Sequence, residues 1–303
     1  MPRNYTRHFR VRSTDCDALR QVNHAVYLRY MQEAAIEASA DAGYTGAWYA
    51  EHGVGWVIRR SRIDYLRPAR YGDELAVTTY VANFRRVRSQ RNYEIERSDG
   101  VPIARAATDW VFIDRRTGLP KRIPDEVPGN LMPDGPDPAV EFALDAAPLP
   151  DSPPPNAYHA TRRINYYDLD ENQHVNNAVY LNYLEQATID AASSLGYDLP
   201  QLLALGGVFV VRQHDIEYLR PARYGDTLDI ATWVGEVTRS SAVRHYAMRI
   251  QGGELSIRAQ TRWVWIDLTS RNSAEVPASL LEALARQGVE RDSPRSEAER
   301  DGA

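Results

Sequence analysis

The chain contains one sequence pattern twice, and this repeat constrains its fold more than any other feature. The stretch IDYLRPARYGD at residues 63–73 recurs as IEYLRPARYGD at residues 216–226, 153 positions later, with one difference. The same shift places Tyr27 on Tyr180 and Trp110 on Trp263. Solenoid repeats are much shorter, about 20–50 residues. The sequence therefore predicts a duplicated domain whose two copies face each other across a pseudo-two-fold axis, as the subunits of an isologous dimer do.

Proline marks the boundary between the copies, because eleven of the eighteen prolines lie between Pro120 and Pro155. Proline at this density disfavours helices and central strands, so we expect an extended connector with short turns. The predicted boundaries are residues 1–119 for the first domain, 120–157 for the linker and 158–287 for the second domain. Residues 288–303 are charged and poor in large apolar side chains, and we predict a disordered tail there.

Each copy has the same predicted order of elements. A short strand precedes a polar cluster, and apolar residues then recur at three- and four-residue spacing, which predicts helices over residues 25–42 and 178–194. Strand-like segments follow, with hairpin turns at the SDG and QGG stretches. One helix with four or five antiparallel strands is an α+β arrangement. We expect the sheet to wrap around the apolar stripe of the helix.

Composition excludes several classes of function. The net charge of −5 leaves no basic surface for nucleic acid, and the RRVRSQR run at residues 85–91 is typical of solvated surface. The single cysteine, Cys16, cannot form an intrachain disulfide and fits a reducing compartment, so we expect a cytoplasmic protein. We find no secretory signal and no apolar stretch long enough for a membrane span. No zinc, dinucleotide or phosphate-loop motif occurs, and we expect neither a metal nor a cofactor.

The polar clusters before the helices are the candidate functional segments. They read DCDALRQVNHAVY at residues 15–27 and DLDENQHVNNAVY at residues 168–180. Asp170, Asn172 and His174 occupy alternate positions, which would place them on one side of an extended segment. The helix that follows offers free N–H groups and a positive dipole end for a carbonyl oxygen. A carboxylate, an amide and an imidazole at such a place can activate water and stabilise an oxyanion.

This order of strand, polar cluster, helix and YLRPARYGD strand resembles the hotdog-fold thioesterases of the 4-hydroxybenzoyl-CoA thioesterase type. The tandem arrangement resembles double-hotdog acyl-ACP thioesterases, and the resemblance covers nearly all of residues 5–118 and 158–285. It implies two tandem hotdog domains, each an antiparallel sheet wrapped around a central helix. It also implies an enzyme that hydrolyses acyl-CoA or acyl-ACP thioesters. Further pairing of such chains into a homo-oligomer is left open.

The second cluster resembles the catalytic segment of plant-type acyl-ACP thioesterases. The resemblance implies that Asp170 acts as base or nucleophile, His174 as acid–base or polarising group, and Asn172 as the residue that orients substrate or water. The plant enzymes are expected to carry further acidic and cysteine residues where this chain has Pro221 and Ala222. A mechanism with a cysteine nucleophile is therefore unsupported.

The residues at the helix starts are candidates for substrate binding. In the second copy these are Asn176 and Asn177, and the backbone N–H near Asn177 is the candidate oxyanion donor. In the first copy Asn23 takes the place of Asn176.

The first cluster departs from the second. Asp17 is retained, but Leu19 and Gln21 stand in place of the amide and the imidazole, and His24 follows seven residues after Asp17. An aspartate and a histidine at this spacing resemble the short- and medium-chain acyl-CoA thioesterases of this fold. Asp17 and His24 could form a second working site, or the copy could only complete a shared acyl pocket. We favour a less active first copy.

The sequence contains other candidate residues and leaves other functions open. Glu33 and Glu185 lie on the predicted helices at positions that do not align, which favours surface or helix-pairing roles. The remaining histidines, among them His214, are isolated in the sequence. A hydratase or dehydratase of the hotdog fold is another alternative, and such enzymes are expected to carry a D-x-N-P-x-H motif. Here Asp170 and His174 are four residues apart with no proline between them, which argues against this alternative. A non-catalytic module that binds acyl thioesters remains an alternative.

Overall fold

The computed structural model describes residues 3–133, 135, 142, 144, 147–251 and 253–288. The predicted tail lies outside the described residues, apart from Gly288. None of the helices in the described ranges is long and apolar enough to span a membrane.

The two halves have matching elements. The first half contains β1 (Tyr5–Arg10), α1 (His24–Asp41), α2 (Gly46–Glu51), β2 (Val54–Tyr65), β3 (Glu74–Phe84), β4 (Arg88–Arg97) and β5 (Pro102–Asp114). A short helix, α3 (Glu126–Leu131), follows in the connecting segment. The second half contains β6 (Tyr158–Arg163), α4 (Asn177–Ser194), α5 (Leu199–Ala204), β7 (Gly207–Tyr218), β8 (Thr227–Val237), β9 (Ser241–Ile250), β10 (Leu255–Asp267) and α6 (Ala278–Ala285).

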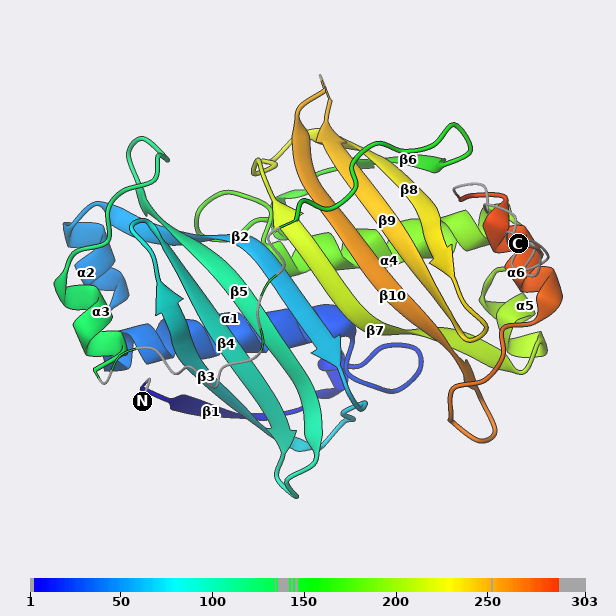
Figure 1. Cartoon of the computed structure of the whole chain (residues 1–303), viewed down its shortest axis with the longest axis horizontal. Coiled ribbons are helices and arrows are strands. Elements are labelled where there is room, and N and C mark those ends of the chain that lie inside the picture. Colours follow the sequence, from blue (N-terminus) through cyan, green and yellow to red (C-terminus); the bar gives the residue numbers. More distant parts are fainter. Residues whose placement is uncertain are drawn as a thin grey trace, which may run out of the picture.

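All ten strands form one antiparallel sheet in the order β1-β3-β4-β5-β2-β7-β10-β9-β8-β6 (Figure 1). The order of the second half mirrors that of the first, and β2 pairs with β7 at the centre. Arg62 lies opposite Asp215 in this pair, and these residues are repeat counterparts. The predicted pseudo-two-fold axis therefore passes through the junction of β2 and β7, and the predicted α+β hotdog architecture is confirmed.

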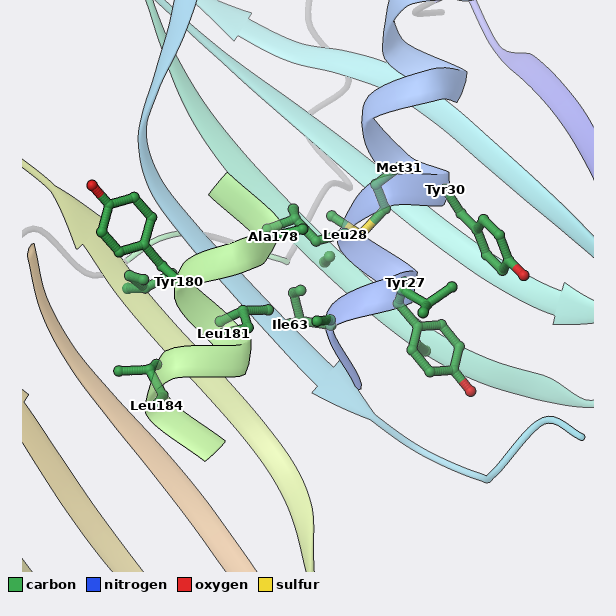
Figure 2. Close-up of a cluster of buried hydrophobic side chains, with 14 of the residues drawn as sticks. Tyr27, Leu28, Tyr30, Met31, Ile63, Ala178, Tyr180, Leu181 and Leu184 are labelled. Carbon is green, nitrogen blue, oxygen red and sulfur yellow. The ribbon is translucent and has the colours of Figure 1, made fainter. Parts of the chain in front are cut away.

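The long helices α1 and α4 lie on the same face of the sheet, with their first turns near the middle of the molecule (Figure 1). They begin within one residue of the predicted positions. Leu28 and Met31 of α1 belong to one buried cluster with Leu181 and Leu184 of α4 and Ile63 of β2 (Figure 2). Burying each such side chain contributes about 1.5–3 kcal/mol. The two halves thus share a single hydrophobic core.

A buried ion cluster crosses the junction of the halves. The guanidinium of Arg60 donates to both carboxylate oxygens of Asp215, at 2.8 and 2.9 Å, and to Glu217 at 2.9 Å. Its side chain is only 4% exposed. The repeat counterpart of Arg60 is the neutral Gln213. It donates to Asp64, the counterpart of Glu217, at 2.6 Å. The junction is therefore chemically asymmetric although its backbone pairing is symmetric.

The connecting segment corrects one expectation. We expected an extended connector, yet residues 126–131 form α3, whose Val127 and Leu131 pack in a cluster with Tyr44 and Phe112. Pro128 is tolerated because it is the third residue of the helix, where the N–H has no intrahelical acceptor. The short helices α2, α5 and α6 were also not predicted, since six to eight residues carry little periodic signal.

Candidate active site

The second polar cluster is a tight turn and not an extended segment, so that expectation is wrong. The N–H of Asp170 donates to the carbonyl of His174 at 2.9 Å, and Gln173 adopts a positive φ of 60°. An Asp170 carboxylate oxygen accepts from the N–H of Asn172 at 2.8 Å. Aspartate favours such turns because its side chain bonds to the backbone two residues on.

The turn places the three side chains in different environments. Asn172 is exposed and accepts a hydrogen bond at 3.1 Å from Arg115, at the end of the first half's sheet. Asp170 and His174 are half-buried. Burial and the charge of Arg223 lower the pKa of His174, against the opposing effect of Asp170. No hydrogen bond joins the side chains of Asp170, Asn172 and His174 in the part of the chain that the structure describes.

The start of α4 lies directly after this turn. The side chain of Asn176 caps the helix by accepting from the N–H of Ala178 at 2.9 Å. Asn177 is the first helical residue, and its carbonyl accepts from the hydroxyl of Tyr218 at 3.1 Å. First-turn N–H groups have no intrahelical acceptor, so the N–H of Asn177 remains the candidate oxyanion donor.

The first polar cluster folds into the same turn. An Asp17 carboxylate oxygen accepts from the N–H groups of Leu19, at 2.8 Å, and Gln21, at 3.3 Å. Burial raises the pKa of Asp17, these hydrogen bonds oppose the rise, and the charge of Glu185 adds to it. Asp17 is thus a carboxylate held by the backbone in a poorly hydrated position next to a helix start.

His24 and Asn23 meet α4 of the other half. His24 is 8% exposed, with its Nε2 3.4 Å from the carbonyl of Leu181 and its Nδ1 3.7 Å from Oε1 of Glu185. Asn23 caps α1 through its side-chain oxygen, while its Nδ2 donates to Oε2 of Glu185 at 3.1 Å. Burial lowers the pKa of His24 and the charge of Glu185 partly offsets this. The structure therefore joins Asn23 and His24 to a carboxylate from the second half, and the charge of this carboxylate acts on Asp17.

Glu185, for which the sequence favoured a surface or helix-pairing role, lies at the start of the other half's helix. Its carboxylate touches residues more than 150 positions away, and no local pattern reports such a contact. The sequence did contain one indication of this role. The repeat counterpart of Glu185 is the neutral Gln32, so the two copies differ in charge at this helix position.

His214 is not isolated, contrary to our reading of the sequence. It lies on β7, fully buried, with its ring centroid 4.7 Å from that of His24. Its Nδ1 is 2.8 Å from the hydroxyl of Thr261, and burial, with the neighbouring His24, lowers its pKa well below the ordinary value. The hydroxyl of Tyr65 donates to the carbonyl of His24 at 3.0 Å. Buried rings and hydrogen bonds therefore hold His24 in place.

The site around Asp170 lacks these ionisable partners. By the repeat offset, the positions of His24, Glu185 and His214 are taken by Asn177, Gln32 and Ser61. In the described ranges, no group of three or more histidine, cysteine, aspartate or glutamate side chains could hold a metal ion.

The duplicated hotdog fold and the polar cluster before each long helix can be compared with known protein families. A model of the thioesterase-like superfamily matches residues 11–131 and 164–284, so the chain belongs to this superfamily. The family and fold that the sequence predicted are thereby confirmed.

Relatives and solved structures agree with this placement. The chain is 25% identical over 275 residues to the palmitoyl-acyl carrier protein thioesterase of Gossypium hirsutum, covering 86% of this chain and 63% of the relative. It is 30% identical over 123 residues to the long-chain acyl-CoA thioesterase FadM of Escherichia coli, covering 40% of this chain and 92% of the relative. The 12:0-ACP thioesterase of Umbellularia californica superposes with a TM-score of 0.71 at 23% identity, over 86% of this chain and 94% of that chain. At this level of identity, the similarity to the Umbellularia californica structure shows a shared fold.

Proposed function

We propose that the protein hydrolyses acyl thioesters of coenzyme A or of an acyl carrier protein, releasing a carboxylic acid and a thiol. The observation that carries the proposal is the cluster of Asp17, Asn23, His24 and Glu185 at the first turn of α1. Membership in the thioesterase-like superfamily and the thioesterase names of its relatives support it. The lone cysteine supports a reducing compartment such as the cytoplasm.

The reaction needs a base, an oxyanion site and a proton for the thiolate. Asp17 takes a proton from water, and the water oxygen attacks the thioester carbonyl carbon. Because burial raises the pKa of Asp17, its carboxylate is a stronger base than an exposed aspartate. The carbonyl oxygen accepts a backbone hydrogen bond at the start of α1, where the helix dipole stabilises negative charge.

Collapse of the tetrahedral intermediate breaks the C–S bond. The proton taken by Asp17 returns to the thiolate, directly or through the imidazole of His24. The net change is one water consumed, with one carboxylic acid and one thiol formed. Glu185 orients His24 and Asn23 through the contacts of 3.7 and 3.1 Å.

The Asp170 site is the second site in this proposal. Asp170 would act as base, His174 as acid–base group, Asn172 as the orienting amide, and Asn176 and Asn177 would bind substrate at the start of α4. We assign the faster chemistry to the Asp17 site, since only there does a carboxylate from the opposite helix meet the imidazole. This reverses the preference drawn from the sequence.

Thiol release from acyl-CoA and acyl-ACP substrates of increasing chain length tests the proposal. The native chain is compared with Asp17→Asn, Asp170→Asn and the double variant. We expect Asp17→Asn to remove most of the turnover and the double variant to remove all of it. If Asp170→Asn alone abolishes turnover, the assignment of the sites is reversed. If the native chain binds these thioesters without releasing thiol, hydrolysis is excluded and a binding module remains.

A further inference from the structure

A polar cavity of about 290 Å³ lies beside the first turns of α4, outside the site described above. Arg29 of α1, Arg162 of β6, Asp168 of the turn before α4, and Asn182 and Tyr183 of α4 contribute to its wall. The cavity therefore brings together two cations, one carboxylate and several neutral polar side chains from both halves of the chain.

The first half fills the equivalent space. There, Phe9 stacks on Tyr30 with ring centroids 4.4 Å apart. Arg12 pairs with Asp15 at 3.0 Å, and the hydroxyl of Tyr30 donates to the same carboxylate at 2.8 Å. This arrangement leaves the carboxylate and the hydroxyl satisfied, and Phe9 packs where the second half has Arg162.

Two residues around this cavity differ from their counterparts in the first half. Arg162 replaces Phe9, and Asn165 replaces Arg12. Asp168 then accepts from the N–H of Asn165 at 2.8 Å. The apolar filling and the local ion pair of the first half are thus both replaced.

Polar groups in this wall lack partners. The hydroxyl of Tyr183 makes no hydrogen bond of ordinary geometry and the residue is 3% exposed, while burial and the neighbouring Asp168 raise the pKa of this hydroxyl and Arg162 opposes the rise. The Nε of Arg162 is also buried and unpartnered, while its guanidinium lies 5.1 Å from the centre of the Tyr183 ring. Buried polar groups are nearly always hydrogen-bonded, so such groups around a cavity indicate a missing partner.

The charge of the wall selects the partner. Arg29 and Arg162 outnumber Asp168, which leaves one excess positive charge. Neither arginine forms an ion pair with a carboxylate within the described residues. A guanidinium binds phosphate and carboxylate groups through two parallel N–H bonds, and the hydroxyl of Tyr183 can donate a further bond. We propose that this cavity binds the phosphate or carboxylate group of a small molecule.

Titration calorimetry on the full chain tests this proposal, with inorganic phosphate, acetate and coenzyme A as probes at constant ionic strength. We expect phosphate or acetate to bind at one site, with binding weakened at least about tenfold by Arg162→Gln and severalfold by Tyr183→Phe. Arg163→Gln is the matched control, because neighbouring strand residues point to opposite sides and Arg163 is exposed. It should change the affinity less than twofold.

The probes also separate the sources of the anion. Coenzyme A binding that depends on Arg162 would identify the phosphate of a thiol carrier, whereas preferential acetate binding would identify a carboxylate ligand. The proposal is overturned if neither small anion binds the native chain below about 10 mM, or if Arg162→Gln and Arg163→Gln weaken binding equally. Tyr183→Phe removes a single oxygen and leaves the ring beneath Arg162, so thermal unfolding of this variant separates lost binding from lost fold.

Discussion

Glu185 connects the two halves through single side-chain contacts. It receives a hydrogen bond from Asn23 and lies 3.7 Å from His24, while the chain around it looks like an ordinary helix surface. A half-buried carboxylate beside an imidazole favours the charged imidazolium form, and burial opposes this. Burial is the larger effect and lowers the pKa of His24, so the neutral imidazole, which can accept a proton, is favoured.

Replacing Glu185 with glutamine should reduce kcat by about 100-fold or more, because it removes the carboxylate that orients His24. Glu33→Gln is the control, since Glu33 lies exposed on α1 and pairs only with Arg7 at 3.3 Å in the described residues. Steady-state thiol release measures both variants. Equal rates for the native chain and Glu185→Gln would remove Glu185 from the mechanism.

The pH dependence of the rate should report Asp17. Burial raises its pKa above the ordinary value of 3.8, and the charge of Glu185 adds to the rise. We expect kcat/KM to fall as the pH drops through a value above 3.8, because protonated Asp17 cannot act as a base. Glu185→Gln removes a neighbouring negative charge and should move this limb to lower pH. A limb at the same pH in both proteins would contradict the role of Asp17.

Stability should depend on pH through the buried histidines. Burial lowers the pKa of His24 and His214 in the folded chain, whereas both have a pKa near 6.5 when unfolded. Below pH 6.5 the unfolded chain therefore binds more protons, and the free energy of unfolding falls with falling pH. Each buried histidine contributes a slope of up to about 1.4 kcal/mol per pH unit. Urea unfolding at several pH values should show a shallower slope for His214→Gln, and an unchanged slope would show that His214 does not titrate on unfolding.

The turn and helix start form one structural unit that occurs twice. In each copy, an aspartate organises the turn and an asparagine caps the helix directly after it. The two caps differ in one respect, because Asn23 also donates to Glu185 and Asn176 serves as a cap within its own half. The same local structure thus acquires a cross-half contact in one copy.

Substitutions at Asn23 should separate these two roles. Asn23→Ala should lower the free energy of unfolding by about 0.5–2 kcal/mol because the cap is lost. Asn23→Ser should restore most of this stability, since serine also caps helices, but it cannot reach Glu185 as the amide does. We expect Asn23→Ser to have near-native urea unfolding and reduced kcat. If serine restores both stability and kcat, Asn23 acts only as a cap.

The continuous sheet and shared core make the two halves one folding unit. The junction contains Arg60, whose buried guanidinium pairs with Asp215 and Glu217, and Arg258 also pairs with Glu217. Removing one partner of such a cluster leaves buried charges uncompensated, whereas exposed pairs contribute little.

Arg60→Ala should therefore lower the free energy of unfolding by about 3–5 kcal/mol. Arg59→Ala is the control, because Arg59 is 41% exposed and lies 3.7 Å from Asp109. It should cost less than about 1 kcal/mol. Urea unfolding followed by circular dichroism measures both, and equal losses would contradict the importance of the central ion cluster.

Much of the molecule follows from the sequence by local rules. The repeat predicted two equivalent domains, and spacing predicted α1 and α4 to within one residue at their starts. The polar clusters correctly marked the segments at the helix starts. The internal structure of these segments was not predictable from alternation, because Asp17 and Asp170 bend the backbone into turns through their own side chains.

Tertiary structure decided which residues of the two halves meet. The contacts of His24 with Leu181 and of Asn23 with Glu185 span 157 and 162 residues. They exist because β2 pairs with β7 and thereby brings the first turn of α1 against α4. Periodicity and turn chemistry describe neighbours along the chain, and they contain no information on contacts between the two halves. The sequence thus determined the family, the duplication and the two helix-start segments, while long-range packing determined that a carboxylate of one half contacts the helix start of the other.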